Sequence, residues 1–141
     1  MSGIKNLKRI ALDSNFFIYH FESNPEFVKH IAPIFEALQK DGLEAVTSVV
    51  SIIEALSYPS PPEVIAGIKE GFATMSHLSI INLNPEIAVE AAAIRREYGF
   101  KLPDAVQLAT AISFKAKAFF TNDHRLRSFK KLKIISLSDL A

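Results

Sequence analysis

The sequence contains no cysteine among its 141 residues, which excludes disulfide bonds, thiolate zinc sites and cysteine nucleophiles. It also contains no apolar run that approaches the roughly 18 residues of a membrane helix. The opening residues, MSGIKNLKRIALDSN, have too few apolar positions to form the hydrophobic centre of a secretion signal. We therefore expect a soluble, cytoplasmic protein with no membrane association.

The low net charge, the positions of the glycines and the residue after Ser14 exclude further classes of protein. The formal net charge is +1, so the chain is not the strongly basic kind that coats nucleic acid, and a polyanion must be bound locally. The five glycines form no phosphate-binding loop, and the G-x-S-x-G motif of a serine hydrolase is absent. Asn15 stands two positions after Asp13, where a phosphatase of the haloacid dehalogenase type needs a second aspartate.

Short apolar segments alternate with helical ones along the chain. This alternation predicts strands at residues 9–13, 43–48, 79–83, 118–123 and 133–137, and helices at 14–23, 25–42, 49–58, 62–78, 85–100 and from Pro103 onward. With 49% hydrophobic residues, the chain can bury one sizeable core. We expect an α/β fold: a single domain over residues 1–141, with a central, mostly parallel five-stranded sheet flanked by helices.

Four acidic residues are predicted to lie at one edge of this sheet. Asp13 ends the first strand, Asp123 follows the fourth, and Asp104 begins the helix that returns to it. Glu54 lies in the helix after the second strand, and its longer side chain can reach the same edge. Crowded carboxylates need a cation, and an all-oxygen ligand set favours Mg²⁺ or Mn²⁺. The sequence thus predicts metal-dependent cleavage of a phosphate ester by these acids.

Polar and basic residues beside the acids are candidates for supporting roles. Hydroxyl and amide side chains could orient the carboxylates or bind a phosphate oxygen; these are Ser14, Asn15, Thr121 and Asn122. Residues 115–133 contain seven lysines and arginines against one acid. We expect the phosphates of a nucleic acid to be contacted by Arg125, Arg127 and Lys130.

Four segments resemble the motifs of the PIN domain family, and of its VapC-like toxins in particular: LDSN with Asp13, SIIEAL with Glu54, KLPDAVQLATA with Asp104 and FFTND with Asp123. Serine replaces the threonine of the family's common opening, LDTN, and keeps the hydroxyl group. The resemblance implies a ribonuclease, dependent on Mg²⁺ or Mn²⁺, in which these four acids bind the metal. It also implies a homodimer, a small antitoxin partner and a structured RNA substrate such as transfer, ribosomal or messenger RNA.

Alternatives to a toxin nuclease remain open at this point. Each acid taken alone has a structural explanation, in a turn, on an exposed helix face or at a helix start. The chain could be a catalytically silent PIN-like module that binds RNA or a protein. It could also be a PIN ribonuclease of RNA processing outside a toxin–antitoxin pair.

Two further patterns concern packing. Gly67 and Gly71 lie four residues apart in one predicted helix, which indicates close packing or a dimer surface. Four phenylalanines near the predicted site could stack on bases but are expected in the core: Phe16, Phe17, Phe119 and Phe120.

Overall fold

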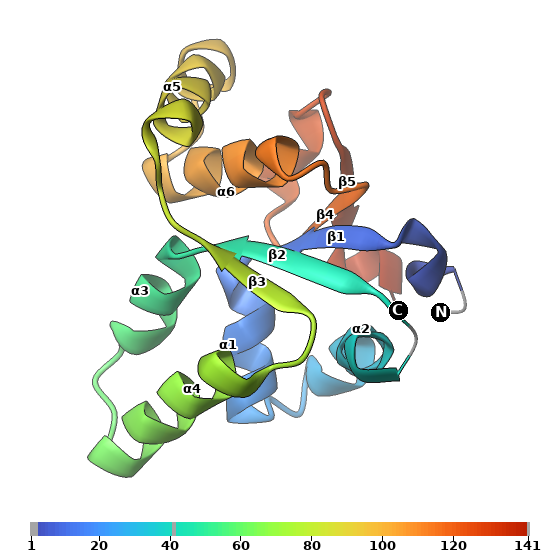
Figure 1. The fold of residues 1–141 in the computed structure, drawn as a ribbon, viewed down its shortest axis with the longest axis vertical. Coiled ribbons are helices and arrows are strands. Elements are labelled where there is room, and N and C mark those ends of the chain that lie inside the picture. Colours follow the sequence, from blue (N-terminus) through green and yellow to red (C-terminus); the bar gives the residue numbers. More distant parts are fainter. Residues whose placement is uncertain (1–2, 41, 141) are drawn as a thin grey trace.

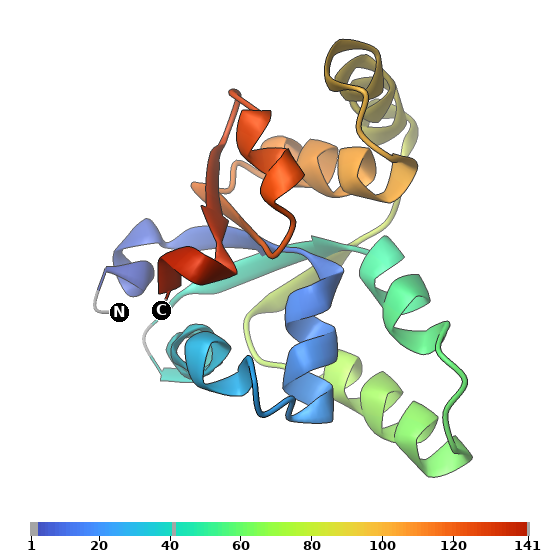
Figure 2. The ribbon, with the colours of Figure 1, turned by 180° about the vertical axis from the view of Figure 1, so that it is seen from behind.

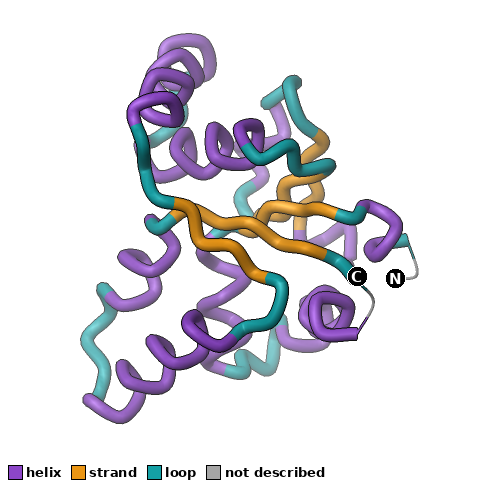
Figure 3. The backbone as a smooth tube through the Cα atoms, in the orientation of Figure 1, coloured by secondary structure: helices purple, strands orange, loops and turns teal. Residues whose placement is uncertain are grey.

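A five-stranded parallel sheet forms the centre of the molecule. The structure, a computed structural model, describes residues 3–40 and 42–140. The strands are β1 (Arg9–Leu12), β2 (Glu44–Ser48), β3 (Leu78–Ile81), β4 (Ala118–Thr121) and β5 (Lys133–Ser136). They are arranged in the order β3-β2-β1-β4-β5, and every pair is parallel, where a mostly parallel sheet was predicted (Figures 1 and 3).

Helices cover both faces of the sheet. One face is packed by α1 (Ser14–Glu22), α2 (Val28–Lys40), α3 (Val50–Leu56) and α4 (Pro62–Thr74), and the other by α5 (Pro85–Tyr98) and α6 (Leu102–Ser113) (Figures 1 and 2). Short 3-10 helices lie at Ile4–Leu7, His124–Ser128 and Leu137–Leu140. None of these described helices has the length and apolarity needed to cross a membrane. The α/β fold predicted from the sequence is confirmed.

The sheet separates two hydrophobic clusters because successive strand residues point to opposite faces. Phe119 packs with the α5 and α6 side chains, whereas Phe120 packs with those of α1 to α4. Both rings are fully buried, as are Phe16 and Phe17. The prediction that these four phenylalanines belong to the core is confirmed.

Most helix ends follow the proline and glycine signals in the sequence, with two corrections. Helix α5 begins after Asn84, whose side chain accepts a hydrogen bond from Ile87 N, and ends at Gly99, which has a φ of 72°. Helix α2 begins at Val28 instead of residue 25, because the Asn24 side chain accepts from Glu26 N and holds a turn there. Helix α4 ends at Thr74 instead of residue 78, since the chain becomes extended at Met75 before β3.

The two glycines of α4 have different environments. A Cβ atom at Gly71 would collide with the ring of Phe21 in α1, so this glycine allows close packing inside the chain. No atom lies within 4 Å of the position that a Cβ atom would take at Gly67. Gly71 therefore has a role in helix packing within the chain, and a dimer surface at this helix stays a prediction.

Candidate active site

The candidate site lies where the strand order reverses. The chain adds β2 and β3 on one side of β1 and then places β4 on the other side, so β1 and β4 are neighbours at the switch point. Ligands of open α/β sheets bind outside the carboxyl ends of the strands at such a point. Asp13 follows β1 directly, with its N–H donating to Phe120 O at 3.0 Å, and Asp123 follows β4.

The Asp13 carboxylate is buried and held by two hydrogen bonds. As the N-cap of α1, its Oδ1 accepts from Ser14 N at 2.7 Å, and its Oδ2 accepts from Thr121 Oγ1 at 2.7 Å. Burial raises the pKa of Asp13 to about 6, and the charges of Asp104 and Glu54 add to the rise, although both hydrogen bonds oppose it. A carboxylate in this position is stabilised by any cation brought to the edge of the sheet.

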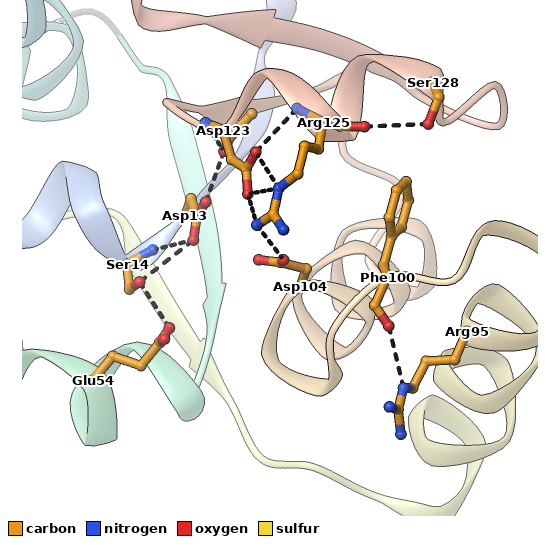
Figure 4. Close-up of polar contacts among 10 residues, drawn as sticks. Asp13, Ser14, Glu54, Arg95, Phe100, Asp104, Asp123, Arg125 and Ser128 are labelled. Carbon is orange, nitrogen blue, oxygen red and sulfur yellow. Dashed lines mark hydrogen bonds and ion pairs between the residues drawn. The ribbon is translucent and has the colours of Figure 1, made fainter.

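Ser14 connects Asp13 to Glu54. Its hydroxyl lies 2.8 Å from Glu54 Oε1 and 3.4 Å from Asp13 Oδ1, so its single proton is donated mainly to Glu54 (Figure 4). The Glu54 side chain extends from α3 toward the start of α1, as we expected from the length of a glutamate side chain. Asn15 follows Ser14 on α1 and lines a cavity beside Glu54. Within the part of the chain that the structure describes, its side chain forms no hydrogen bond with the four acids.

Asp104 and Asp123 share one arginine. Arg125 donates from Nε to both carboxylate oxygens of Asp123, at 3.0 and 3.1 Å, and its Nη2 lies 3.9 Å from Asp104 Oδ2 (Figure 4). The hydrogen bond from Arg125 lowers the pKa of Asp123. Burial raises the pKa of Asp104, and the neighbouring Asp123 charge raises it further, against the opposing effect of Arg125. One of the two negative charges is thus already balanced by a cation from the chain itself.

The four acids form two pairs around one edge. Asp13 and Glu54 meet through Ser14, and Asp104 and Asp123 meet through Arg125. Across residues 3–40 and 42–140, no three carboxylate or imidazole side chains converge closely enough to hold one ion. The oxygen-only donors and the convergence of two carboxylates on a cation fit Mg²⁺ or Mn²⁺ chemically, provided that the Arg125 guanidinium moves away.

The other predicted site residues divide into two groups. Thr121 orients Asp13 and also accepts from Asp123 N at 3.0 Å, so it links two of the acids. Asn122, in contrast, donates to the Tyr19 hydroxyl at 2.9 Å and lies beside α1. Thr121 therefore has the geometry of a supporting residue, whereas Asn122 has a structural contact.

The predicted phosphate-binding residues also differ from one another. Arg127 pairs with Asp139 at 3.1 Å and contacts Ser136, at the end of β5, so its guanidinium is held by these groups and not by the four acids. Lys130 is exposed, and its backbone N–H lies 3.4 Å from the Tyr98 hydroxyl. Arg125 is the one member of this predicted set that contacts the site acids among the described residues.

A buried polar network behind the site was missed in the sequence. Gln107 of α6 is 2% exposed; its Oε1 accepts from Ser48 N at 3.1 Å and its Nε2 donates to Ser51 Oγ at 2.8 Å. Ser51 in turn lies 2.6 Å from Thr47 Oγ1. The network ties the helix of Asp104 to β2 and to the helix of Glu54. The available signal was a glutamine within the otherwise apolar segment AVQLA, three residues after Asp104.

Comparisons with known proteins identify the family and the fold. The model of the PIN domain family matches residues 10–132, so the chain belongs to the PIN domain family. No protein in a search of curated sequences matches the chain.

Solved structures share the fold at low sequence identity. A toxin–antitoxin complex from Klebsiella pneumoniae has a TM-score of 0.68 at 22% identity, over 91% of this chain and 97% of that one. VapBC2 from Rickettsia felis, bound to a promoter DNA fragment, has a TM-score of 0.72 at 18% identity, over 91% and 98% of the two chains. DNA-bound VapBC from Salmonella typhimurium has a TM-score of 0.70 at 20% identity, over 92% and 98%.

Proposed function

We propose that this protein is a metal-dependent endoribonuclease that hydrolyses RNA phosphodiester bonds and acts as the toxin of a toxin–antitoxin pair. The observation that supports the proposal best is the gathering of Asp13, Glu54, Asp104 and Asp123 at the carboxyl edge of the sheet, in two bridged pairs. Membership of the PIN family adds to it. Carboxylates placed together without a permanent counter-ion for each are a common arrangement for binding a catalytic metal.

In this proposal the four acids hold Mg²⁺ or Mn²⁺. The chemistry that such an ion supplies is activation of a water for in-line attack on phosphorus and neutralisation of the leaving oxygen. Ser14 and Thr121 keep the Asp13 carboxylate in one orientation through their hydrogen bonds. Arg125, which is 62% exposed, can turn from the acids toward a substrate phosphate.

The proposed partners follow from the family and from the fold neighbours. Several neighbours are described as VapBC or toxin–antitoxin complexes. On that basis we propose a small antitoxin protein that blocks the active site, a structured RNA substrate, a homodimeric assembly and a cytoplasmic location for this chain.

Cleavage of end-labelled transfer and ribosomal RNA tests the activity. Purified protein, freed of any bound partner, should give discrete fragments with Mg²⁺ or Mn²⁺ and none with EDTA. The variants Asp13→Asn, Asp104→Asn and Glu54→Gln should each lose cleavage. The matched control is Glu44→Gln, because Glu44 lies at the opposite edge of the sheet, paired with Arg9. Fragments that persist in EDTA or in the three variants would refute the proposal.

A second candidate is a PIN module that binds RNA or protein without cleavage. The Arg125 ion pair favours it, since this arginine occupies the place between two of the acids. Thermal unfolding with Mn²⁺ distinguishes the nuclease from the binding module. If Asp104 is a metal ligand, Mn²⁺ should raise the melting temperature of the native protein and not that of Asp104→Asn. A melting temperature that Mn²⁺ leaves unchanged would favour the binding module.

A further inference from the structure

A cavity of about 340 Å³ adjoins the acids on the side of α6. Two of its lining residues, Asp104 and Arg125, belong to the candidate active site, and the others include Tyr98, Phe100, Lys101 and Ser128. In Figure 4 the Phe100 ring projects from the α5–α6 connection toward the segment that carries Arg125 and Ser128. The cavity is therefore continuous with the place where a phosphodiester would be cleaved.

Phe100 is held in a fixed position. Its ring stacks on Tyr98 with a centroid distance of 5.3 Å and an interplanar angle of 13°, and Phe129 packs against both rings. Arg95 Nε donates to the Phe100 carbonyl at 3.2 Å, and Gly99 takes the positive φ that the turn requires. Phe100 is nevertheless only partly buried, so part of a rigid aromatic ring faces the cavity.

The remaining lining groups suit the rest of a nucleotide. Lys101 and Arg125 bring two cations to the cavity, and Ser128 brings a hydroxyl. The volume lies near the lower limit of small-molecule sites, roughly 300–1,000 Å³, so it suits one nucleotide better than a longer segment. An aromatic ring beside cations is the usual means of holding a base and its phosphate in single-stranded nucleic acid. Lys130, which is exposed, continues from the same segment, which favours RNA over a peptide.

We propose that this cavity binds one unpaired nucleobase of the RNA next to the cleaved phosphodiester. The base stacks on Phe100, and Lys101 and Arg125 contact its phosphate. The inference rests on the proposed ribonuclease function and adds to it the selection of an unpaired nucleotide at the site of cleavage.

Binding of a labelled single-stranded RNA octamer tests the proposal. We would measure its affinity by fluorescence anisotropy with Mn²⁺ in the Asp13→Asn background, where cleavage is absent, and compare it with an octamer that has abasic riboses at all positions. Phe100→Ala should weaken binding of the normal RNA by about 5- to 150-fold, the effect of losing one base–aromatic stack. The same substitution should leave the weaker binding of the abasic octamer unchanged.

Two further variants make the result decisive. Phe100→Leu keeps apolar contacts with the neighbouring aromatic residues and removes the stack, so it should weaken binding in a protein of near-native stability. Phe114→Ala is the matched control, because Phe114 packs against the same hydrophobic cluster but lines a cavity with Arg9 and Glu44 at the opposite edge of the sheet.

Three other results of the binding measurements would contradict the inference, and each has a different meaning. Equal losses for normal and abasic RNA, or equal losses in Phe100→Leu and Phe114→Ala, would show that Phe100 acts on folding alone. Normal RNA binding that both Phe100 variants retain would exclude a base site and leave the cavity to a protein partner. Failure of the background protein to bind RNA, together with failure of the native protein to cleave it, would refute the ribonuclease function itself.

Discussion

At the scale of single residues, Arg125 is the cation that lies between two of the four acids. Its guanidinium contacts Asp123 and approaches Asp104, which are two of the proposed metal ligands. In the proposed nuclease, a cation from the chain and a divalent ion would therefore compete for the same carboxylate oxygens. Metal binding should require the arginine to leave, and the released guanidinium is then free for an RNA phosphate.

The first prediction follows from this competition. Arg125→Gln should bind Mn²⁺ about two- to fivefold more tightly, the range expected for loss of an exposed ion pair, and should cleave RNA more slowly. Isothermal titration calorimetry measures the affinity, and Arg127→Gln is the control because Arg127 pairs with Asp139 instead. Mn²⁺ affinity that is unchanged or weaker in Arg125→Gln would contradict the competition.

The second prediction concerns the buried carboxyl of Asp13. Its folded-state pKa of about 6 lies above the ordinary value of 3.8, so in metal-free protein its contribution to stability is present below pH 3.8 and is lost as pH rises through 6. Asp13→Asn should therefore be more stable than the native protein above pH 7, by at most about 3 kcal/mol at 1.36 kcal/mol per pKa unit. The difference should shrink toward pH 4.

Urea unfolding in metal-free buffer between about pH 2 and pH 8 measures this effect. Asp139→Asn should change the stability in the opposite direction and be less stable than the native protein. The reason is that a backbone hydrogen bond from Ser136 lowers the pKa of Asp139. Asp139 contributes stability above its ordinary pKa and loses it as pH falls through the lowered value. A stability difference between native protein and Asp13→Asn that does not vary with pH would refute the assigned role of Asp13 burial.

At the scale of the elements, one side chain fixes the relative position of α6, β2 and α3. Gln107→Met keeps the length of the side chain but removes the acceptor of Ser48 N and leaves Ser51 Oγ with Thr47 alone. We predict a loss of about 1–3 kcal/mol in the free energy of unfolding, the cost of an unsatisfied buried polar group, with slower RNA cleavage. Urea midpoints measure the loss. Gln39→Met, at an exposed position of α2, is the control; equal stability of the two variants would contradict the prediction.

The elements also show how far the sequence alone can specify the structure. Buried parallel strands are nearly continuous apolar runs, so RIAL and AFFT could be located from composition, together with the acids that follow them. The start of α2 could not, because it depends on which neighbouring groups the Asn24 side chain contacts. The Gln107 network and the partners of Arg125 and Arg127 depend on tertiary distances that no local pattern contains.

At the scale of the whole molecule, both hydrophobic clusters depend on the same sheet. Alternate residues of β4 enter opposite clusters, so neither face can lose its packing without exposing strands that the other face needs. This arrangement predicts that the chain unfolds as one cooperative unit, which is the behaviour of a single domain.

Substitutions at adjacent positions of β4 test this last prediction. Phe119→Ala and Phe120→Ala each remove a fully buried ring, one from each cluster, and should each lower the free energy of unfolding by about 3–5 kcal/mol. In urea, circular dichroism and tyrosine fluorescence should give one coincident transition for both variants, whereas Val89→Ala, at an exposed position of α5, should resemble the native protein. Two separate transitions in either phenylalanine variant would mean that the faces fold independently, because damage to one cluster would then leave the other intact.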